Sequence, residues 1–469
     1  MNQNPVSAPS TKTVESHSLF RTPDGKNYLI PFLLIASLFL LWGFCHGLMD
    51  VLDKHFQDSL HIAKAKSAMV QFSGYVGYFF MAMPAGWIAR RFGYKGGVLA
   101  GLAIICVGAL WFIPATKLAP SVSTNLAFAM FLTGLFIIFG GLTCLETVAN
   151  PYTTVLGPEP TSAARINFAQ SLNSVGWIFG PLVGSQFLFS ASAQAAGQDQ
   201  LWIPYAGVAV IVAILFVVFW KVKLPEIKAA DHYHDEERHD AGPVRVLWSH
   251  KHFLGAVSAQ FCYVAAQTGI FSFFINYMTQ DTPPLGPGAV AFMAHWFPAD
   301  WTHVVNGATH LADAGSAHFL SLGGFTLFFL GRFIGGVLLR RVHAHKLLGV
   351  YAVACAALMA GIVMNRGWFS PVCLLLSFFF MSIMFPTIFA LGLHGLGAQT
   401  KRASSFIVMA IVGGAVMPMA MGRVADIYGS MVPGFTVPMI CFAVIAIYGL
   451  LWSKLSGSEG ITGVSAAGH

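Results

Sequence analysis

Charged side chains are scarce in this sequence. Only 10% of its 469 residues are Asp, Glu, Lys or Arg, whereas 56% are hydrophobic. Soluble domains usually carry about 25% charged residues, so this composition excludes an ordinary soluble protein. Long apolar runs separated by short polar segments predict a polytopic membrane protein.

Motifs for metal, redox or nucleotide chemistry are also missing. The seven cysteines lie in apolar segments and none forms a CxxC pair, and no Walker loop, GxSxG or zinc-ligand spacing occurs. The cysteines therefore indicate small buried side chains. We predict neither an enzyme nor an ATP-driven pump, with no cofactor, no metal and no nucleic-acid partner.

Spanning helices need about 20 mostly apolar residues. The segments that meet this requirement are 28–53, 66–90, 95–115, 125–150, 163–189, 201–222, 252–278, 316–341, 345–365, 369–395, 402–425 and 433–454. Most of the 26 Lys and Arg residues fall on one side of these twelve segments if the N-terminus lies inside. The positive-inside rule then places both termini in the cytoplasm.

Two sequence patterns occur once in each half of the chain. GWIARR at 86–91 is similar to GVLLRR at 336–341. In the second pattern, Pro151 and Gly157 have the same spacing as Pro386 and Gly392, and Arg165 and Pro181 have the same spacing as Arg402 and Pro418. Repeats of this kind predict two six-helix bundles that bind substrate between them near the membrane midplane.

The predicted organisation therefore has two bundles, 28–222 and 252–455. A cytoplasmic linker, 223–251, joins them, and cytoplasmic tails, 1–27 and 456–469, flank them. The linker contains DHYHDEERHD at 231–240. Its histidines and acids could bind a metal, but a solvated connector is the favoured interpretation because linkers are commonly polar.

Several longer motifs resemble a known transporter family. GWIARRFGYK at 86–95 resembles the conserved loop of the major facilitator superfamily, with Arg90 where that family usually has Asp. LMDVL (48–52), CLETVANPYTTVLGPE (144–159), NFAQSLNSVG (167–176), QFCYVAAQ (260–267) and MFPTIFALGLHGLG (384–397) resemble the bacterial L-fucose:proton symporters and the related glucose/galactose and N-acetylhexosamine permeases.

This resemblance implies an all-α membrane protein with 12 transmembrane helices in two pseudo-symmetric six-helix bundles, the major facilitator fold. It also implies that Asp50 and Glu146 carry the coupling protons. A carboxylate inside the membrane costs about 2.5–3.5 kcal/mol on insertion scales, and such residues are functional by default. The alternative is a structural acid that is hydrogen-bonded within the bundle.

One face of the first predicted helix is polar. Trp42, His46, Asp50 and Asp53 follow one another at helical spacing, which indicates that they share a face. A polar stripe within a span should line a water-filled cavity. We interpret Asp53, at the outer end, as a solvated residue, and we expect Trp42 and His46 to contact substrate.

Amides and aromatics recur on two further helices. They are Asn167, Gln170, Asn173 and Trp177 on the fifth, and Gln260, Tyr263 and Gln267 on the seventh. Amides both donate and accept hydrogen bonds, as sugar hydroxyls do, and aromatic rings can cover the apolar face of a sugar. These amides could instead join helices. The family resemblance favours Gln170 and Asn173 as sugar ligands, then Gln260 and Gln267. Asn150 could serve either purpose.

Arginines are expected to act at gates and in topology. Arg332 lies inside the eighth predicted span, where pairing with an acid or with carbonyls at the inner gate is favoured over contact with substrate. The remaining gate or topology residues are Arg90, Arg91, Arg165, Arg340, Arg341 and Arg402.

We therefore predict a monomeric sugar:proton symporter of the bacterial cytoplasmic membrane that works by alternating access. L-Fucose is the first candidate substrate, followed by glucose, galactose, mannose or N-acetylglucosamine. A proton-uncoupled facilitator and a sugar sensor that does not transport are the other possibilities.

Overall fold

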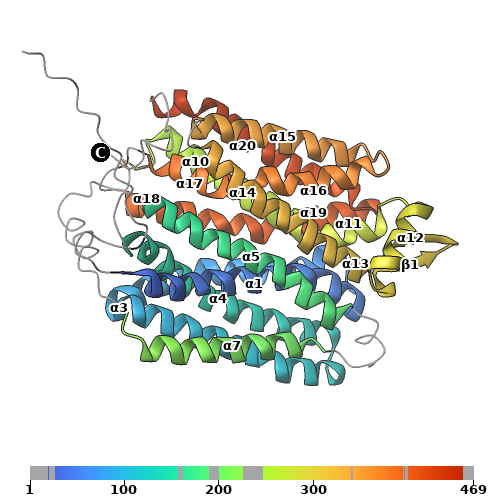
Figure 1. The fold of residues 1–469 in the computed structure, drawn as a ribbon, viewed down its shortest axis with the longest axis horizontal. Helices are drawn as coiled ribbons and strands as arrows, with labels where there is room; N and C mark the ends of the chain where they lie inside the picture. Colours follow the sequence, from blue (N-terminus) through green and yellow to red (C-terminus); the bar gives the residue numbers. More distant parts are fainter. Residues whose placement is uncertain are drawn as a thin grey trace, which may run out of the picture.

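Long α-helices make up most of the molecule (Figure 1). The computed structural model describes residues 20, 27–156, 162–189, 200–224, 247–339, 342–394, 396 and 400–457. A small β-hairpin lies at one end, here called the hairpin end, and the opposite end, where α1 begins and α20 finishes, is called the terminal end.

Five long helices come from the first half of the chain. They are α1 (Leu29–Leu60), α3 (Met69–Leu118), α4 (Thr124–Val155), α5 (Ser162–Leu188) and α7 (Trp202–Lys221), with the short α2 (Lys64–Ser67) and η1 (Ala119–Ser121). Helix α3 covers the two predicted spans 66–90 and 95–115, and Gly93, at φ 70°, breaks it between them. In this group α3 packs against α4 and α7, and α1 packs against α5.

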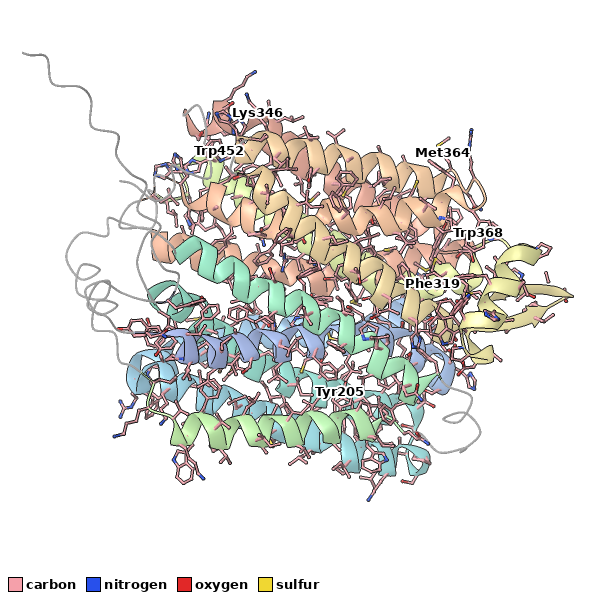
Figure 2. The ribbon with its side chains drawn as sticks, viewed as in Figure 1. Tyr205, Phe319, Lys346, Met364, Trp368 and Trp452 are labelled. Carbon is pink, nitrogen blue, oxygen red and sulfur yellow. The ribbon has the colours of Figure 1, made fainter. Side chains whose placement is uncertain are left out.

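The helices of the second half of the chain are more often interrupted. Its helices are α10 (Lys251–Ser272), α11 (Phe274–Gln280), α14 (Thr326–Leu338), α15 (Ala344–Val363), α16 (Phe369–Met381), α17 (Met384–Leu393), α18 (Thr400–Met409), α19 (Gly413–Tyr428) and α20 (Thr436–Ser456), with the short turns η6 (Phe319–Phe325), η8 (Ala410–Val412) and η9 (Val432–Phe435). Helix α15 runs the length of this half, and Lys346 near its start and Met364 just beyond it lie at opposite ends of the molecule (Figure 2).

Nine of the described helical segments are long and apolar enough to cross a membrane. The other three predicted spans are helical but less apolar than these nine, namely 66–90, 163–189 and 252–278. Each carries polar side chains that the fold buries, such as Gln71, Asn173 and Gln260. Low hydropathy here follows from polar faces that point inward, as expected for helices around a polar site.

An ordered insertion occupies the hairpin end between α11 and η6. It consists of α12 (Pro287–Trp296), η5 (Ala299–Trp301), β1 (Thr302–Val305), β2 (Ala308–Leu311) and α13 (Asp313–His318). The two antiparallel strands pair Thr302 with Leu311, and Asn306-Gly307 forms the turn with both residues at positive φ. Such Asn-Gly turns match the twist of a hairpin.

The two groups of helices meet along several elements. Helix α5 contacts η6, α13 and α14, and α19 contacts α2 and α3, while α1 contacts α10 and α11. In Figure 1 the blue-to-green helices lie on one side of this contact, and the yellow-to-red helices lie on the other. The polar side chains of α1, α3, α5 and α10 therefore belong to the helices that meet there.

Candidate functional site

The polar stripe of α1 is buried in the protein. His46 is 3% exposed and Asp50 is 2% exposed. His46 Nδ1 lies 3.0 Å from the carbonyl oxygen of Trp42, one turn earlier. A carbonyl can only accept, so this nitrogen carries a proton in the hydrogen bond.

An aromatic cluster surrounds His46. Its ring faces rings from three other helices in addition to Trp42 of α1 itself. The distances between ring centroids are 4.7 Å to Phe139, 5.0 Å to Trp42, 5.5 Å to Trp177, 5.9 Å to Tyr78 and 6.4 Å to Tyr75. The arrangement joins α1, α3, α4 and α5 around one imidazole, and two of the rings, Trp42 and Trp177, are those predicted from the sequence to cover a sugar.

Glu146 adjoins this cluster. Its half-buried carboxylate forms a side-chain hydrogen bond with Tyr78, and the Trp42 indole N–H donates to the same hydroxyl. Tyr75 interacts electrostatically with both Glu146 and Asp50. The two acids predicted to carry protons thus both lie near one tyrosine.

Asp53 is not the solvated residue that the sequence suggested. It is 0% exposed, because α3 and α10 cover this part of α1. Gln71 Nε2 donates to Asp50 Oδ1 at 3.1 Å and to Asp53 Oδ2 at 3.4 Å. A single amide therefore bridges two buried carboxyl groups.

The amides of α5 divide into different environments. Asn173 is buried, and its Nδ2 donates to the Phe39 carbonyl of α1 at 3.2 Å. This contact is the helix-joining role named as the alternative for these amides. Gln170 is half-buried, and its backbone carbonyl accepts a hydrogen bond from Arg332. The side chains of Asn150 and Asn167 lie outside the described residues.

Helix α10 presents polar groups that lack partners. Gln260 and Tyr263 are both 0% exposed, and neither the amide atoms nor the tyrosine hydroxyl has a hydrogen-bond partner within the described part of the chain. Gln267 is half-buried. Unpaired buried groups are costly, so these atoms are available to bind the polar groups of a substrate.

Arg332 joins the two groups of helices. Its Nη1 donates to the Gln170 carbonyl and the Ser174 hydroxyl, each at 3.0 Å, and its Nε donates to the Ser382 carbonyl at 3.3 Å. The guanidinium thus pairs with carbonyls, the alternative favoured from the sequence. Arg91, by contrast, is exposed and lies over Trp87. The other predicted gate residues have side chains outside the described set: Arg90, Arg165, Arg340, Arg341 and Arg402.

Contacts between the two groups close the hairpin end. The Asp426 carboxylate accepts hydrogen bonds from the backbone N–H groups of Lys64, at 3.1 Å, and Ala65, at 2.9 Å. Asn276 donates to Gln57 at 2.6 Å. Burial lowers the pKa of Lys64, while Asp281 and Asp426 act in the opposite direction.

A second charged contact ties the insertion to α1. Lys54 Nζ lies 2.6 Å from Asp58 and 3.2 Å from Asp313 at the start of α13. No cluster of His, Cys, Asp or Glu suited to a metal occurs among the described residues, and the histidine-rich segment 231–240 lies outside them.

Sequence reasoning missed three residues of this site on α3. Gln71, Tyr75 and Tyr78 follow one another at spacings of four and three. That spacing places them on one helix face, and it is the same signal that identified the stripe on α1.

The chain matches the family model described as Major Facilitator Superfamily over residues 32–411. It is 34% identical to the L-fucose-proton symporter of Escherichia coli, with 91% of this chain and 93% of that protein covered. It is 32% identical to a glucose/galactose transporter of Brucella abortus, with 92% of this chain and 96% of that protein covered.

Solved structures show the same relationship. A variant of the Escherichia coli fucose:proton symporter is 33% identical over 91% of this chain and 100% of that chain, with a TM-score of 0.64. A proton:xylose symporter is 14% identical and shares the fold, with a TM-score of 0.65 over 94% of this chain and 98% of the other. This multi-pass membrane protein therefore belongs to the major facilitator superfamily, and within it to the family of transporters that includes the bacterial L-fucose-proton symporter.

Proposed function

We propose that this protein is a proton-coupled monosaccharide importer of the bacterial cytoplasmic membrane, with L-fucose as the first candidate substrate. The similarity to the Escherichia coli L-fucose-proton symporter supports this choice. Glucose or galactose is the second candidate, since the Brucella abortus relative bears the name of a glucose/galactose transporter.

The main support for proton coupling comes from the buried acid Asp50. Within the described residues, no ion pair includes Asp50, and its carboxylate is 2% exposed. A buried carboxylate without a cation favours its protonated form. Such a group can bind a proton while it faces one side of the membrane and release it on the other. Glu146, which interacts electrostatically with the same tyrosine as Asp50, is the second proposed proton carrier.

Sugar recognition is assigned to the surrounding aromatic and polar groups. Trp42 and His46 would contact the sugar together with Gln170, Asn173 and Asn150. From the other half of the chain we assign Gln260, Tyr263 and Gln267. The unpaired amide of Gln260 and hydroxyl of Tyr263 support this assignment, because a bound sugar would supply their missing partners.

Transport by alternating access follows from the two groups of helices. We propose that 28–222 and 252–455 move as bundles in a monomer, that 223–251 is their cytoplasmic linker, and that the tails 1–27 and 456–469 are cytoplasmic. The hairpin end then faces outward, and the contacts of Asp426 and Lys54 correspond to a closed outer gate. The arginines predicted to act in gates would hold the inner side.

Uptake by purified protein in proteoliposomes tests the function. Labelled L-fucose, galactose, glucose, mannose and N-acetylglucosamine are offered with and without an inward proton gradient. We expect one of them, with L-fucose first, to accumulate above its external concentration only when the gradient is present. Uptake of every sugar that does not depend on the gradient would contradict the proposal and indicate a facilitator.

A further inference from the structure

Asp53 is a buried acid that pairs with no cation in the described part of the chain. It lies three residues after Asp50 on α1 and is 0% exposed. The neighbouring Lys54 directs its ammonium to Asp58 and Asp313 instead. Among the described residues no cation pairs with either Asp50 or Asp53. Two adjacent ionised carboxylates in such a place would repel each other, and burial would penalise both.

Three acceptor atoms of this cluster lack donors. Asp50 Oδ2, Asp53 Oδ1 and Gln71 Oε1 have no hydrogen-bond partner within the described chain. The amide N–H group of Gln71 already donates to the other oxygen of each acid. A proton bound to either carboxyl converts one of these unpaired acceptors into a donor. It also reduces the charge of the pair, so the geometry favours a pair that holds at least one proton.

The surroundings of the pair come from both groups of helices. On α3, Tyr75 interacts electrostatically with both Asp50 and Glu146 of α4. On α10, Thr268 donates to the Tyr75 hydroxyl at 3.1 Å, and Ser272, one turn later, lies beside Asp53. Helix α10 therefore covers the pair in this closed arrangement. Separation of the two groups of helices would remove Thr268 and Ser272 together.

We propose that Asp50 and Asp53 act as one proton-binding pair, bridged by Gln71 and covered by Ser272 of the opposite bundle. This inference rests on the proposed proton-coupled import. Loading forms one O–H bond on a carboxylate of the pair and removes one unit of negative charge. Release to water on the other side breaks that bond and restores the charge, and no other reactant is consumed. Gln71 is a positioning residue, because it acts through the two acids.

The Asp53→Asn variant tests the proposed pair, because sugar exchange and gradient-driven sugar accumulation can be measured separately. Sugar exchange at equal pH on both sides needs no net proton movement, so the variant should retain it. Accumulation driven by a proton gradient should fall about tenfold or more, because the coupling between proton and sugar is lost. Asp300→Asn is the control, an acid of the insertion that belongs neither to the pair nor to the contacts of Lys54 and Asp426, and it should accumulate sugar as the wild type does.

Gln71→Met removes the bridge while both acids remain. We expect the pH at which accumulation is half-maximal to shift while exchange persists. A purely structural role would lower exchange and accumulation together without a shift in pH dependence. If Asp53→Asn accumulates sugar with the wild-type pH profile, the pair proposal is wrong and Asp53 is a structural acid.

Infrared spectroscopy of the wild-type protein provides a readout that does not depend on the variants. With isotope-labelled aspartate, the carboxyl C=O band distinguishes protonated from ionised aspartates. We expect a protonated aspartate at neutral pH. Ionisation of every aspartate under these conditions would contradict the proposal of a proton-binding pair. If the wild type accumulates no sugar, the proposed function fails, whereas the infrared measurement remains possible and ionisation of every aspartate would still exclude a protonated pair.

Discussion

The carboxylate of Asp426 accepts a hydrogen bond from the backbone N–H of Lys64 at 3.1 Å, although the two residues come from different halves of the chain. A second bond reaches the N–H of Ala65 at 2.9 Å. Carboxylate–amide bonds of this kind are charge-assisted and stronger than neutral ones. They hold α19 to the segment between α1 and α3 at the hairpin end.

Asp426→Ala should open this end more often. Hydrogen bonds to charged groups contribute about 1.5–3 kcal/mol each, so loss of two should shift the balance between the closed and open states. We expect faster amide hydrogen exchange at Lys64 and Ala65, measured by mass spectrometry.

Asp281→Ala is the control for that experiment. Asp281 accepts hydrogen bonds from Ser430 and from the backbone N–H of Met431, at 2.8 Å for Met431. Both hydrogen-bond partners belong to the second half of the chain, and Asp281 forms no hydrogen bond with the N–H of Lys64 or Ala65, so exchange there should increase less than in Asp426→Ala. Equal acceleration in both variants would contradict the role of Asp426 in closure.

Arg332→Lys should slow transport while the positive charge is kept. Lysine is a point charge and lacks the planar fork with which Arg332 reaches the Gln170 carbonyl and the Ser174 hydroxyl. We expect about tenfold slower counterflow of labelled sugar, which corresponds to about 1.4 kcal/mol. Arg366→Lys, at an exposed site between α15 and α16, should transport normally. Unchanged counterflow in Arg332→Lys would show that transport does not need the planar guanidinium group.

Glu146→Gln should uncouple sugar from protons. The amide keeps the shape of the side chain and its ability to bond with Tyr78, but it cannot carry a proton through the cycle. We expect gradient-driven accumulation to disappear, while exchange of internal for external sugar continues. The comparison uses the same proteoliposomes with and without a proton gradient. Persistent accumulation would leave proton coupling to the acids of α1 alone.

Gly47→Ala should destabilise the contact between α1 and α5. A Cβ atom at this position would lie 2.8 Å from the Trp177 carbonyl oxygen and 3.0 Å from Pro181 Cδ. Overpacking of this kind usually costs about 1–3 kcal/mol, so the midpoint of thermal unfolding in detergent should fall. Gly207→Ala, where nothing lies within 4 Å of the added carbon, should leave the midpoint unchanged or raise it. A normal midpoint for Gly47→Ala would show that the two helices can separate slightly at little cost.

The local pattern of residues predicted much of the fold and part of the site. The face shared by Trp42, His46 and Asp50 follows from helical periodicity alone, and in the structure His46 and Asp50 are buried while Trp42 is half-buried. The motifs at 144–159 and 167–176 indicated the family, and the comparisons confirm it. The Asn306-Gly307 turn also carried a hairpin signal, flanked by β-branched residues, although we predicted no hairpin there.

The remaining features depend on contacts between distant segments. The burial of Asp53 arises from α3 and from α10 of the other half, so its position on α1 gave no sign of it. The bond from Asn173 to the Phe39 carbonyl likewise depends on how closely α5 approaches α1. Periodicity identifies the face of a helix, but it does not identify the helix that packs against that face.

The close contact between α1 and α5 has a consequence for affinity. Gly47 and Gly180 bring the two backbones together, with an added Cβ at Gly180 only 2.5 Å from the carbonyl carbon of Gly47. We therefore expect these two helices to move as one unit during transport. Trp42 and Asp50 on one and Trp177 on the other therefore keep the same mutual geometry on both sides of the membrane. Any difference between the affinities for external and internal sugar must then originate in the groups that α10 and α14 bring to this unit or withdraw from it.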